Sequence, residues 1–176
     1  VTSLPGPAAC ITALTMSGLS TRRFCFEGFL PMDKKEREVV LERLKKETRT
    51  TIFYEAPHRL DKTLKVICEA VGNRRLTICK ELTKRHEKNW LTTLEEAIAW
   101  YEENDARGEY VLVVEGIDPK VLEEERQASW ESMTIEAHVA LYESKGQTKK
   151  EAMKSVASDR GMTKREVYQY LIQNEH

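Results

Sequence analysis

The sequence predicts an α/β domain that is followed by a small all-helical tail. As far as Gly116, short apolar runs typical of strands alternate with segments of helical periodicity. After Asp118 the strand pattern stops, and charged helical segments take over. We therefore expect an α/β domain over residues 1–118, a connector over residues 119–132 and a helical tail over residues 133–176.

The elements of the α/β part follow from local patterns. A Pro-Gly-Pro turn precedes a helix of small residues, and Gly72 marks a helix end, a common place for glycine. Apolar runs bounded by turn or charged residues predict the strands. In chain order we expect a helix over 8–16, a strand over 24–29, a helix over 34–47, a strand over 50–54, a helix over 59–71, a strand over 75–80, a helix from 93 and a strand over 110–114.

Three of these elements carry more specific expectations. The first strand is expected to bury one aromatic side, made of Phe24, Phe26 and Phe29. Thr93 and Glu96 are spaced as a capping box, in which each side chain satisfies a backbone donor of the other. Residues 110–114 are apolar without alternation, which predicts a central strand covered on both faces.

The tail is predicted to contain three helices. One spans residues 134–144, and the other two begin at capping boxes opened by Thr148 and Thr163. The last two helices, joined by a short turn at Gly161, resemble a helix-turn-helix. Positive charges outnumber negative charges over residues 145–165, which suits a phosphate-facing surface. A plain helical bundle is the alternative.

Composition limits the class of protein. The chain has 176 residues, a formal net charge of −1 and 32% charged residues, which is typical of a cytoplasmic globular protein. No apolar run approaches the roughly 20 residues that a membrane helix needs. The cysteines lie far apart in apolar stretches, so we expect reduced core thiols and no metal site at Cys10, Cys25, Cys68 and Cys79.

Two polar clusters follow predicted strands, over residues 53–59 and 81–87. Open α/β sheets bind ligands at strand ends, and neighbouring parallel strands would bring both loops to one edge. In the first cluster, an aromatic pair would form one wall of a pocket, made of Phe53 and Tyr54. The polar groups expected to face a ligand are Glu55, His58 and Arg59. A strand, a proline turn and a surface carboxylate are the structural alternative.

The second cluster has the same two interpretations. As an exposed charged loop it would need no function. As a site, it would pair His86 with Glu81 or Glu87 for acid–base chemistry, and Lys84 or Arg85 would hold phosphate. No metal-ligand spacing occurs in it, so we assign no metal.

Two further positions need weighing. Residues 5–9 form either a plain strand-to-helix turn or a turn whose backbone N–H groups approach a ligand, and physical chemistry alone favours the plain turn. No G-K-[ST] follows, so this is not a phosphate loop. His138 lies on the inner side of a tail helix and is predicted to be structural.

Five motifs occur in a set order along the chain: L-P-G-P-A-A at 4–9, F-E-G-F-L-P at 26–31, F-Y-E-A-P-H-R at 53–59, E-L-T-K-R-H-E at 81–87 and G-E-Y-V-L-V-V-E-G at 108–116. Together they resemble the ribosomal RNA small subunit methyltransferase I family, within the tetrapyrrole methylase (class III methyltransferase) superfamily. Ala8 departs from the commonest pattern, which has serine there, so no hydroxyl contact is expected at this position.

The resemblance implies a fold, a cofactor and a partner domain. The fold would be the C-terminal α/β domain of a tetrapyrrole methylase, a mixed sheet flanked by helices. An N-terminal α/β domain would precede it and is absent from this chain. S-adenosyl-L-methionine would lie in the cleft between the two domains, and family members would be homodimers. The residues implied to touch this cofactor are Pro7, Ala8, Ala9, Phe53, Tyr54 and Val114.

The implied reaction is methylation of a cytidine ribose 2′-hydroxyl in the 16S ribosomal RNA of the small subunit. A ribose hydroxyl is a poor nucleophile at neutral pH, so partial deprotonation would help. Our candidates for orienting or deprotonating it are Glu55, Glu81 and His86. The candidates for holding the substrate are His58, Arg59, Lys84 and Arg85.

Two other functions stay open at this point. A methylase of a small tetrapyrrole would fit the superfamily but would not need a basic helical tail. A non-enzymatic RNA-binding module would fit the tail but not the polar clusters at the strand ends. If half of the cleft belongs to the absent domain, this chain alone would be inactive and would bind the cofactor weakly.

Overall fold

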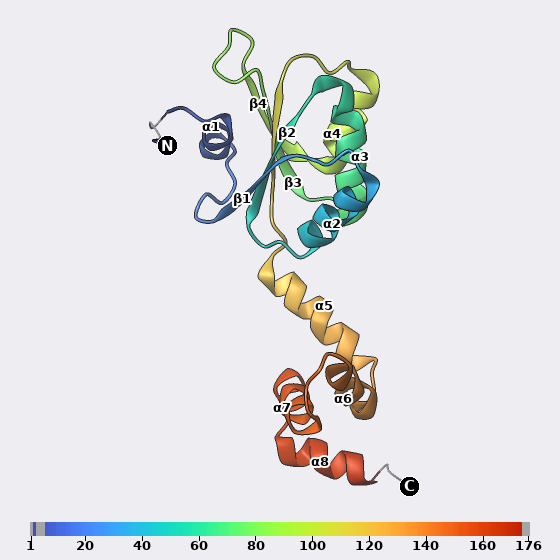
Figure 1. Ribbon diagram of the computed structural model, residues 1–176. Helices are drawn as coiled ribbons and strands as arrows, with labels where there is room; N and C mark the ends of the chain where they lie inside the picture. The colour runs from blue at the N-terminus through green and yellow to red at the C-terminus, as the bar shows by residue number, and fades with distance from the viewer. Residues whose placement is uncertain (1, 3–5, 174–176) are drawn as a thin grey trace. The chain divides into compact units, whose positions relative to one another are not determined.

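The computed structural model describes residue 2 and residues 6–173. The chain divides into two compact units, Val1–Asp118 and Pro119–His176. The first unit contains, in chain order (Figure 1), α1 (Ala9–Met16), β1 (Phe24–Phe29), α2 (Lys34–Lys45), β2 (Thr50–Glu55), the short 3-10 helix η1 (Pro57–Arg59), α3 (Leu60–Val71), β3 (Arg75–Lys80), β4 (Lys88–Thr93), α4 (Leu94–Glu103) and β5 (Tyr110–Val114).

The strands form one five-stranded sheet in the order β1-β2-β5-β3-β4. β1 and β2 are parallel, whereas β5 is antiparallel to both β2 and β3. β4 is antiparallel to β3 and closes the sheet on that side. The last strand in the sequence therefore lies at the centre. This arrangement confirms the predicted α/β fold with a mixed sheet.

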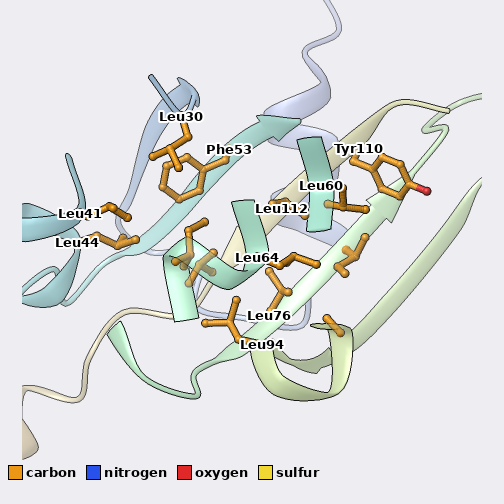
Figure 2. Close-up of a cluster of buried hydrophobic side chains, with 14 residues drawn as sticks. Leu30, Leu41, Leu44, Phe53, Leu60, Leu64, Leu76, Leu94, Tyr110 and Leu112 are labelled. Carbon is orange, nitrogen blue, oxygen red and sulfur yellow. The ribbon is translucent and has the colours of Figure 1, made fainter. Parts of the chain in front are cut away.

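Helices cover both faces of the sheet (Figure 1). α2, α3 and α4 cover one face, where Phe53, Leu76 and Leu112 belong to the main core, as Figure 2 shows. α1 covers the other face and packs against Ile52 and Val113. Neighbours along a strand enter different cores because side chains alternate between the two faces. All residues of β5 are buried, which confirms the predicted central strand.

The starts of α2 and α4 follow from their cap residues. The Asp33 carboxylate accepts from two backbone N–H groups of the first turn of α2. Thr93 caps α4 by accepting from the backbone N–H of Glu96 at 3.3 Å. The predicted capping box is only half formed, because the Glu96 carboxylate accepts instead from the Thr92 hydroxyl at 2.7 Å.

The sequence pattern did not predict β4. This strand spans Lys88–Thr93 and pairs with β3 as a hairpin. It lies at the edge of the sheet, and its two apolar residues, Trp90 and Leu91, are adjacent, so it lacks the apolar alternation that indicates a strand. Residues 81–87 are consequently a hairpin loop rather than the start of a crossover to a helix.

The prediction that the aromatic residues of β1 lie on a buried side is wrong. Phe24, Phe26 and Phe29 are 37%, 49% and 55% exposed. β1 is an edge strand, and its register against β2 shifts between Phe26 and Gly28. This bulge changes the alternation, so that Phe26 and Phe29 both reach the same ring of Tyr54.

The second unit contains four helices: α5 (Pro119–Glu131), α6 (Ile135–Ser144), α7 (Lys149–Asp159) and α8 (Lys164–Gln173). The predicted connector is therefore mostly the helix α5. Val139, Val156 and Val167 belong to the apolar core of this unit. The capping box opened by Thr148 is present. At the start of α8, the Thr163 N–H donates to the Glu166 carboxylate, and the Glu166 N–H donates to the Thr163 hydroxyl. Three helix starts in the tail thus follow the sequence pattern.

His138 is fully buried in this unit, stacked between the rings of Trp130 and Tyr142 at centroid distances of 5.2 and 5.4 Å. The Arg160 Nε donates to His138 Nδ1 at 3.2 Å, which places the ring proton on Nε2. Asp159 Oδ2 lies 3.4 Å from Nε2, but without hydrogen-bond geometry. Burial, and then the Arg160 charge, lower the pKa of His138, so this ring is a neutral structural group.

The four cysteines are free thiols, and Cys79 is the buried one. The expectation of core thiols therefore holds for Cys79, while the other three are half-buried. Among the described residues, no group of three side chains is placed to bind a metal ion. The same part of the chain has no helix with the length and apolarity required to span a membrane.

Candidate active site

Both polar clusters lie at one edge of the sheet. Glu55 at the end of β2 and Lys80 at the end of β3 both pair with Tyr110 at the start of β5. β2 and β3 run in the same direction on either side of the antiparallel β5. The expectation of a common edge is confirmed, although the two strands are not direct neighbours.

Glu55 is buried, with only 2% of its surface exposed. Its Oε2 accepts from the Thr63 hydroxyl at 2.6 Å, and its Oε1 accepts from the Ala56 backbone N–H at 2.8 Å. Arg59 Nε lies 3.5 Å from the same Oε1. These contacts tie the end of β2 to the first turn of α3. The geometry therefore fits a residue that positions the loop better than one that takes a proton from a substrate.

Basic side chains gather around a cavity of about 170 Å³ beside the end of β2. Its cationic or titratable lining residues are Arg37, His58, Arg59 and Lys62. Arg37 Nη1 donates to the Met32 carbonyl at 3.0 Å, and Arg59 Nη2 donates to the Leu30 carbonyl at 2.6 Å. Both guanidinium groups are thereby held in place, while His58 is exposed. Such a group of fixed and exposed cations can hold a phosphate.

Glu81 is held in a tight turn where β3 ends, with a φ of 51°. Its Oε1 accepts from the Glu109 backbone N–H at 2.8 Å and from Lys84 Nζ at 3.1 Å. Gly108 permits this approach, because a Cβ there would lie 2.6 Å from Glu81 Oε1. These donors, the backbone N–H first, lower the pKa of Glu81. A carboxylate with a lowered pKa is a weaker base, so Glu81 is better suited to orienting a hydroxyl.

The rest of the hairpin loop does not form the predicted acid–base pair. The Glu87 carboxylate accepts from the Thr83 backbone N–H at 2.6 Å, and His86 makes no contact with a carboxylate in the part of the chain that the structure describes. Lys84 Nζ is also bound to the Glu109 carboxylate at 2.9 Å. His86 and Arg85 are exposed. These two residues can therefore meet a substrate only as groups on the loop surface.

An aromatic wall, made of Tyr54, Phe26 and Phe29, lies on the α1 side of the sheet. The Tyr54 hydroxyl accepts from the Cys10 backbone N–H at 3.2 Å, which joins the strand to the first turn of α1. Phe26 and Phe29 pack edge-on against Tyr54, at centroid distances of 4.9 and 5.9 Å. Sequence reasoning did not select these two phenylalanines for the site. The signal that could have found them is Gly28 between them, which allows the bulge.

The structure brings together only part of the predicted cofactor set. The residues exposed at the start of α1 are Pro7, Ala8 and Ala9. Tyr54 lies beside this turn, because its hydroxyl accepts from the Cys10 N–H in the first turn of α1. Phe53, however, is fully buried in the main core on the other face, so the expected aromatic pair is separated. Val114 is buried in the same core and pairs near the opposite end of β2.

Residues 1–98 match the model of the family described as Tetrapyrrole (Corrin/Porphyrin) Methylases. The chain belongs to this family. Its similarity to a ribosomal RNA small subunit methyltransferase I of Bacillus subtilis (strain 168) is 48% identity over 168 residues, which cover 96% of this chain and 57% of the relative. The protein of the same name from Synechocystis sp. is 39% identical over 176 residues, covering 99% of this chain and 61% of that relative.

This tetrapyrrole methylase chain thus spans about three fifths of the length of these curated relatives. The resemblance drawn from the five motifs is confirmed by these matches. Among solved structures, one titled "Crystal structure of the methyltransferase CobJ" is 22% identical, with a TM-score of 0.46. It covers 64% of this chain and 49% of its own, a likeness too slight to equate the two structures.

Proposed function

We propose that the chain is part of an S-adenosyl-L-methionine-dependent methyltransferase that modifies a cytidine ribose 2′-hydroxyl in small-subunit 16S ribosomal RNA. The observation that carries this proposal is the similarity to relatives named ribosomal RNA small subunit methyltransferase I, which covers 96% of the chain and so includes the helical tail. The convergence of both polar loops at one edge of the sheet supports a site there.

The cofactor is assigned to the α1 side of this edge. Aromatic rings attract a cation such as the sulfonium group, and the wall of Tyr54, Phe26 and Phe29 offers three of them. The backbone at Ala8 and Ala9 would approach the cofactor beside it. Methyl transfer from a sulfonium has an activated leaving group, so the main task is to align hydroxyl, methyl and sulfur. We assign the opposite wall of the cleft to a further domain of the full-length protein, within the part of the relatives' length that this chain does not span.

The substrate is assigned to the two loops. The basic cavity near His58 and Arg59 and the exposed Arg85 would hold phosphates. Glu81 would orient the ribose hydroxyl, His86 is the candidate base on the loop surface, and Glu55 would keep the first loop in position. The tail would bind the RNA backbone through exposed cations of α7 and α8, namely Lys149, Lys150, Lys154, Lys164 and Arg165.

Methyl transfer from labelled S-adenosyl-L-methionine to unmethylated small subunits tests the proposal in the full-length protein that contains this chain. We expect transfer to ribosomal RNA, with a loss in Glu81→Gln and in His86→Ala. Glu69→Gln, an exposed carboxylate of α3, is the matched control. Full activity in both site variants would remove these residues from the mechanism. Transfer to a tetrapyrrole but not to RNA would replace the proposed function by the small-molecule alternative.

A homodimer that acts in the cytoplasm completes the proposal. Sedimentation of the full-length protein tests the first part, since a dimer should have twice the mass of one full-length subunit. Fractionation of cells tests the second. A monomer at micromolar concentration would contradict the dimer without affecting the assigned reaction.

A further inference from the structure

A second cavity, of about 480 Å³, opens on the face of the sheet that α4 covers. Its lining includes four aromatic residues and two lysines: Trp90, Trp100, Tyr101, Tyr110, Lys80 and Lys88. Tyr110 and Lys80 are also the residues at which β5 begins and β3 ends. The cavity therefore lies at the same edge of the sheet as the candidate active site, on the face opposite to the aromatic wall.

The aromatic lining of this cavity ranges from the buried Tyr110 to the exposed Trp100. Trp90 and Trp100 meet edge to face at a centroid distance of 5.9 Å, and Trp100 is 54% exposed. Tyr101 and Tyr110 form a second such pair at 6.0 Å. The exposed ring of Trp100 offers a face on which a flat ligand group can stack.

The lining also carries three charged side chains, Lys80, Lys88 and Asp105. Lys80 and Lys88 are directly opposite each other in the β3–β4 pair, an arrangement of like charges that destabilises a sheet. Within the described residues, neither forms an ion pair, and Lys80 Nζ lies 5.9 Å from the centre of the Tyr110 ring. The nearby carboxylate of Asp105 is directed to Arg107, at 3.5 Å. An anion bound between the two lysines would relieve their repulsion.

We propose that this cavity is a nucleotide subsite, in which a base of single-stranded RNA stacks on Trp100 and its phosphate lies between Lys80 and Lys88. Aromatic platforms flanked by cations are how proteins bind unpaired nucleotides. The subsite rests on the proposed function and extends it, because it assigns to the RNA a binding surface on the α4 face. A peptide or a second copy of the chain would use the rings without needing the opposed lysines.

Fluorescence of Trp100 tests the stacking directly. In the 176-residue chain carrying Trp90→Phe and Trp130→Phe, Trp100 is the remaining tryptophan. We expect its emission to be quenched on titration with a short unstructured oligoribonucleotide, and to be unchanged by inorganic polyphosphate, which has no bases. Absence of quenching at RNA concentrations up to millimolar would overturn the subsite. Methyl transfer by the full-length protein is a separate readout, so failure of the subsite is distinguishable from failure of the proposed function.

Affinity measurements on the parent chain provide the second test. Trp100→Ala should weaken oligoribonucleotide binding at least about fivefold, since base stacking contributes at that level. Leu91→Ala is the matched control, because Leu91 in β4 is 49% exposed and points to the other face of the sheet. Lys88→Gln should reduce the salt dependence of binding, and Lys35→Gln on α2 should not. Equal affinities for parent and Trp100→Ala, or self-association that Trp100→Ala abolishes, would contradict the proposal.

Discussion

Single carboxylates at the strand ends differ in what they do. Glu55 is buried and saturated by hydrogen bonds from α3 and its own loop. Glu81 is held by a backbone N–H and a lysine, with the pKa of its carboxyl lowered. The residue types alone predict that both could act on a substrate. Their surroundings distinguish the two residues. Glu55 is buried and holds the first loop in position, whereas Glu81 is held in the turn at the end of β3.

Removing the Glu55 carboxylate should destabilise the first unit. In Glu55→Ala the Thr63 hydroxyl and the Ala56 N–H lose their acceptor in a buried place, which costs about 2–3 kcal/mol of unfolding free energy. Urea denaturation measures this loss. Glu69→Ala, which changes an exposed glutamate of α3, should alter the free energy of unfolding by less than about 0.5 kcal/mol. A similar small change in Glu55→Ala would refute the structural role.

Substitution of Gly108 tests whether the lowered pKa of Glu81 depends on the close approach of its carboxylate to the backbone at residues 108 and 109. Gly108→Ala should cost about 1 kcal/mol because φ is +87°, and its Cβ should also push the Glu81 carboxylate out of place. Gly28→Ala is the matched control, since φ is +70° there and no atom lies within 4 Å of the added Cβ. NMR titration of the Glu81 carboxyl should give a pKa closer to the usual range in Gly108→Ala alone. An unchanged titration would show that the contact does not matter.

At the scale of elements, the sequence predicted the features that depend on local residue patterns. It did not predict those that depend on pairing with another strand. Polar residues after apolar runs located the strand-end loops, and the central strand was recognised from its unbroken apolar run. β4 was missed because an edge strand needs no apolar alternation. Phe26 was assigned to the wrong side because a bulge depends on pairing with β2. Phe53 and Tyr54 were grouped although adjacent strand residues face opposite ways.

The buried histidine should make the helical tail sensitive to acid. The pKa of His138 is lowered in the folded tail, so below about pH 6.5 the unfolded chain takes up a proton that the folded chain excludes. Stability is thus complete above that pH and is lost as the pH falls. Amide hydrogen exchange in α6 and α7 should accelerate between pH 7 and pH 5.5, after correction for intrinsic rates, while α3 should not change.

The variant His138→Phe separates titration from packing. It keeps a ring between Trp130 and Tyr142 but cannot bind a proton, so the acid sensitivity of α6 and α7 should disappear even if their overall stability falls. If exchange in this variant still accelerated with acid, another group would be responsible.

At the scale of the whole molecule, the sheet gathers one set of groups at one edge. The aromatic wall and the basic cavity come from residues 26–66, and the hairpin loop comes from residues 81–87. The order of the strands in the sheet could not be predicted from sequence patterns, because strand pairing depends on contacts between distant residues. The two loops were selected as a candidate site because polar residues follow predicted strands, and the resemblance of motifs then suggested a function for them.

Isolated, the chain should bind S-adenosyl-L-methionine weakly, because we assign the other wall of the cleft to a domain outside it. Titration calorimetry of the 176-residue chain should give no saturation at roughly micromolar cofactor, whereas the full-length protein should saturate. Tyr54→Phe in the full-length protein should weaken binding of the cofactor, since it removes the hydroxyl that accepts from the Cys10 N–H. Micromolar affinity of the chain alone would contradict the shared cleft.

The central position of β5 has a consequence for how the protein is made. Residues 110–114 are the last strand of this sheet to leave the ribosome, yet they join β1 and β2 to β3 and β4. Until they emerge, the nascent chain holds two separate strand pairs with open edges, which invite pairing with other chains. The sheet can therefore be completed only after its central strand, β5, has been synthesised. Until then the growing chain is exposed to proteases and to pairing with other chains.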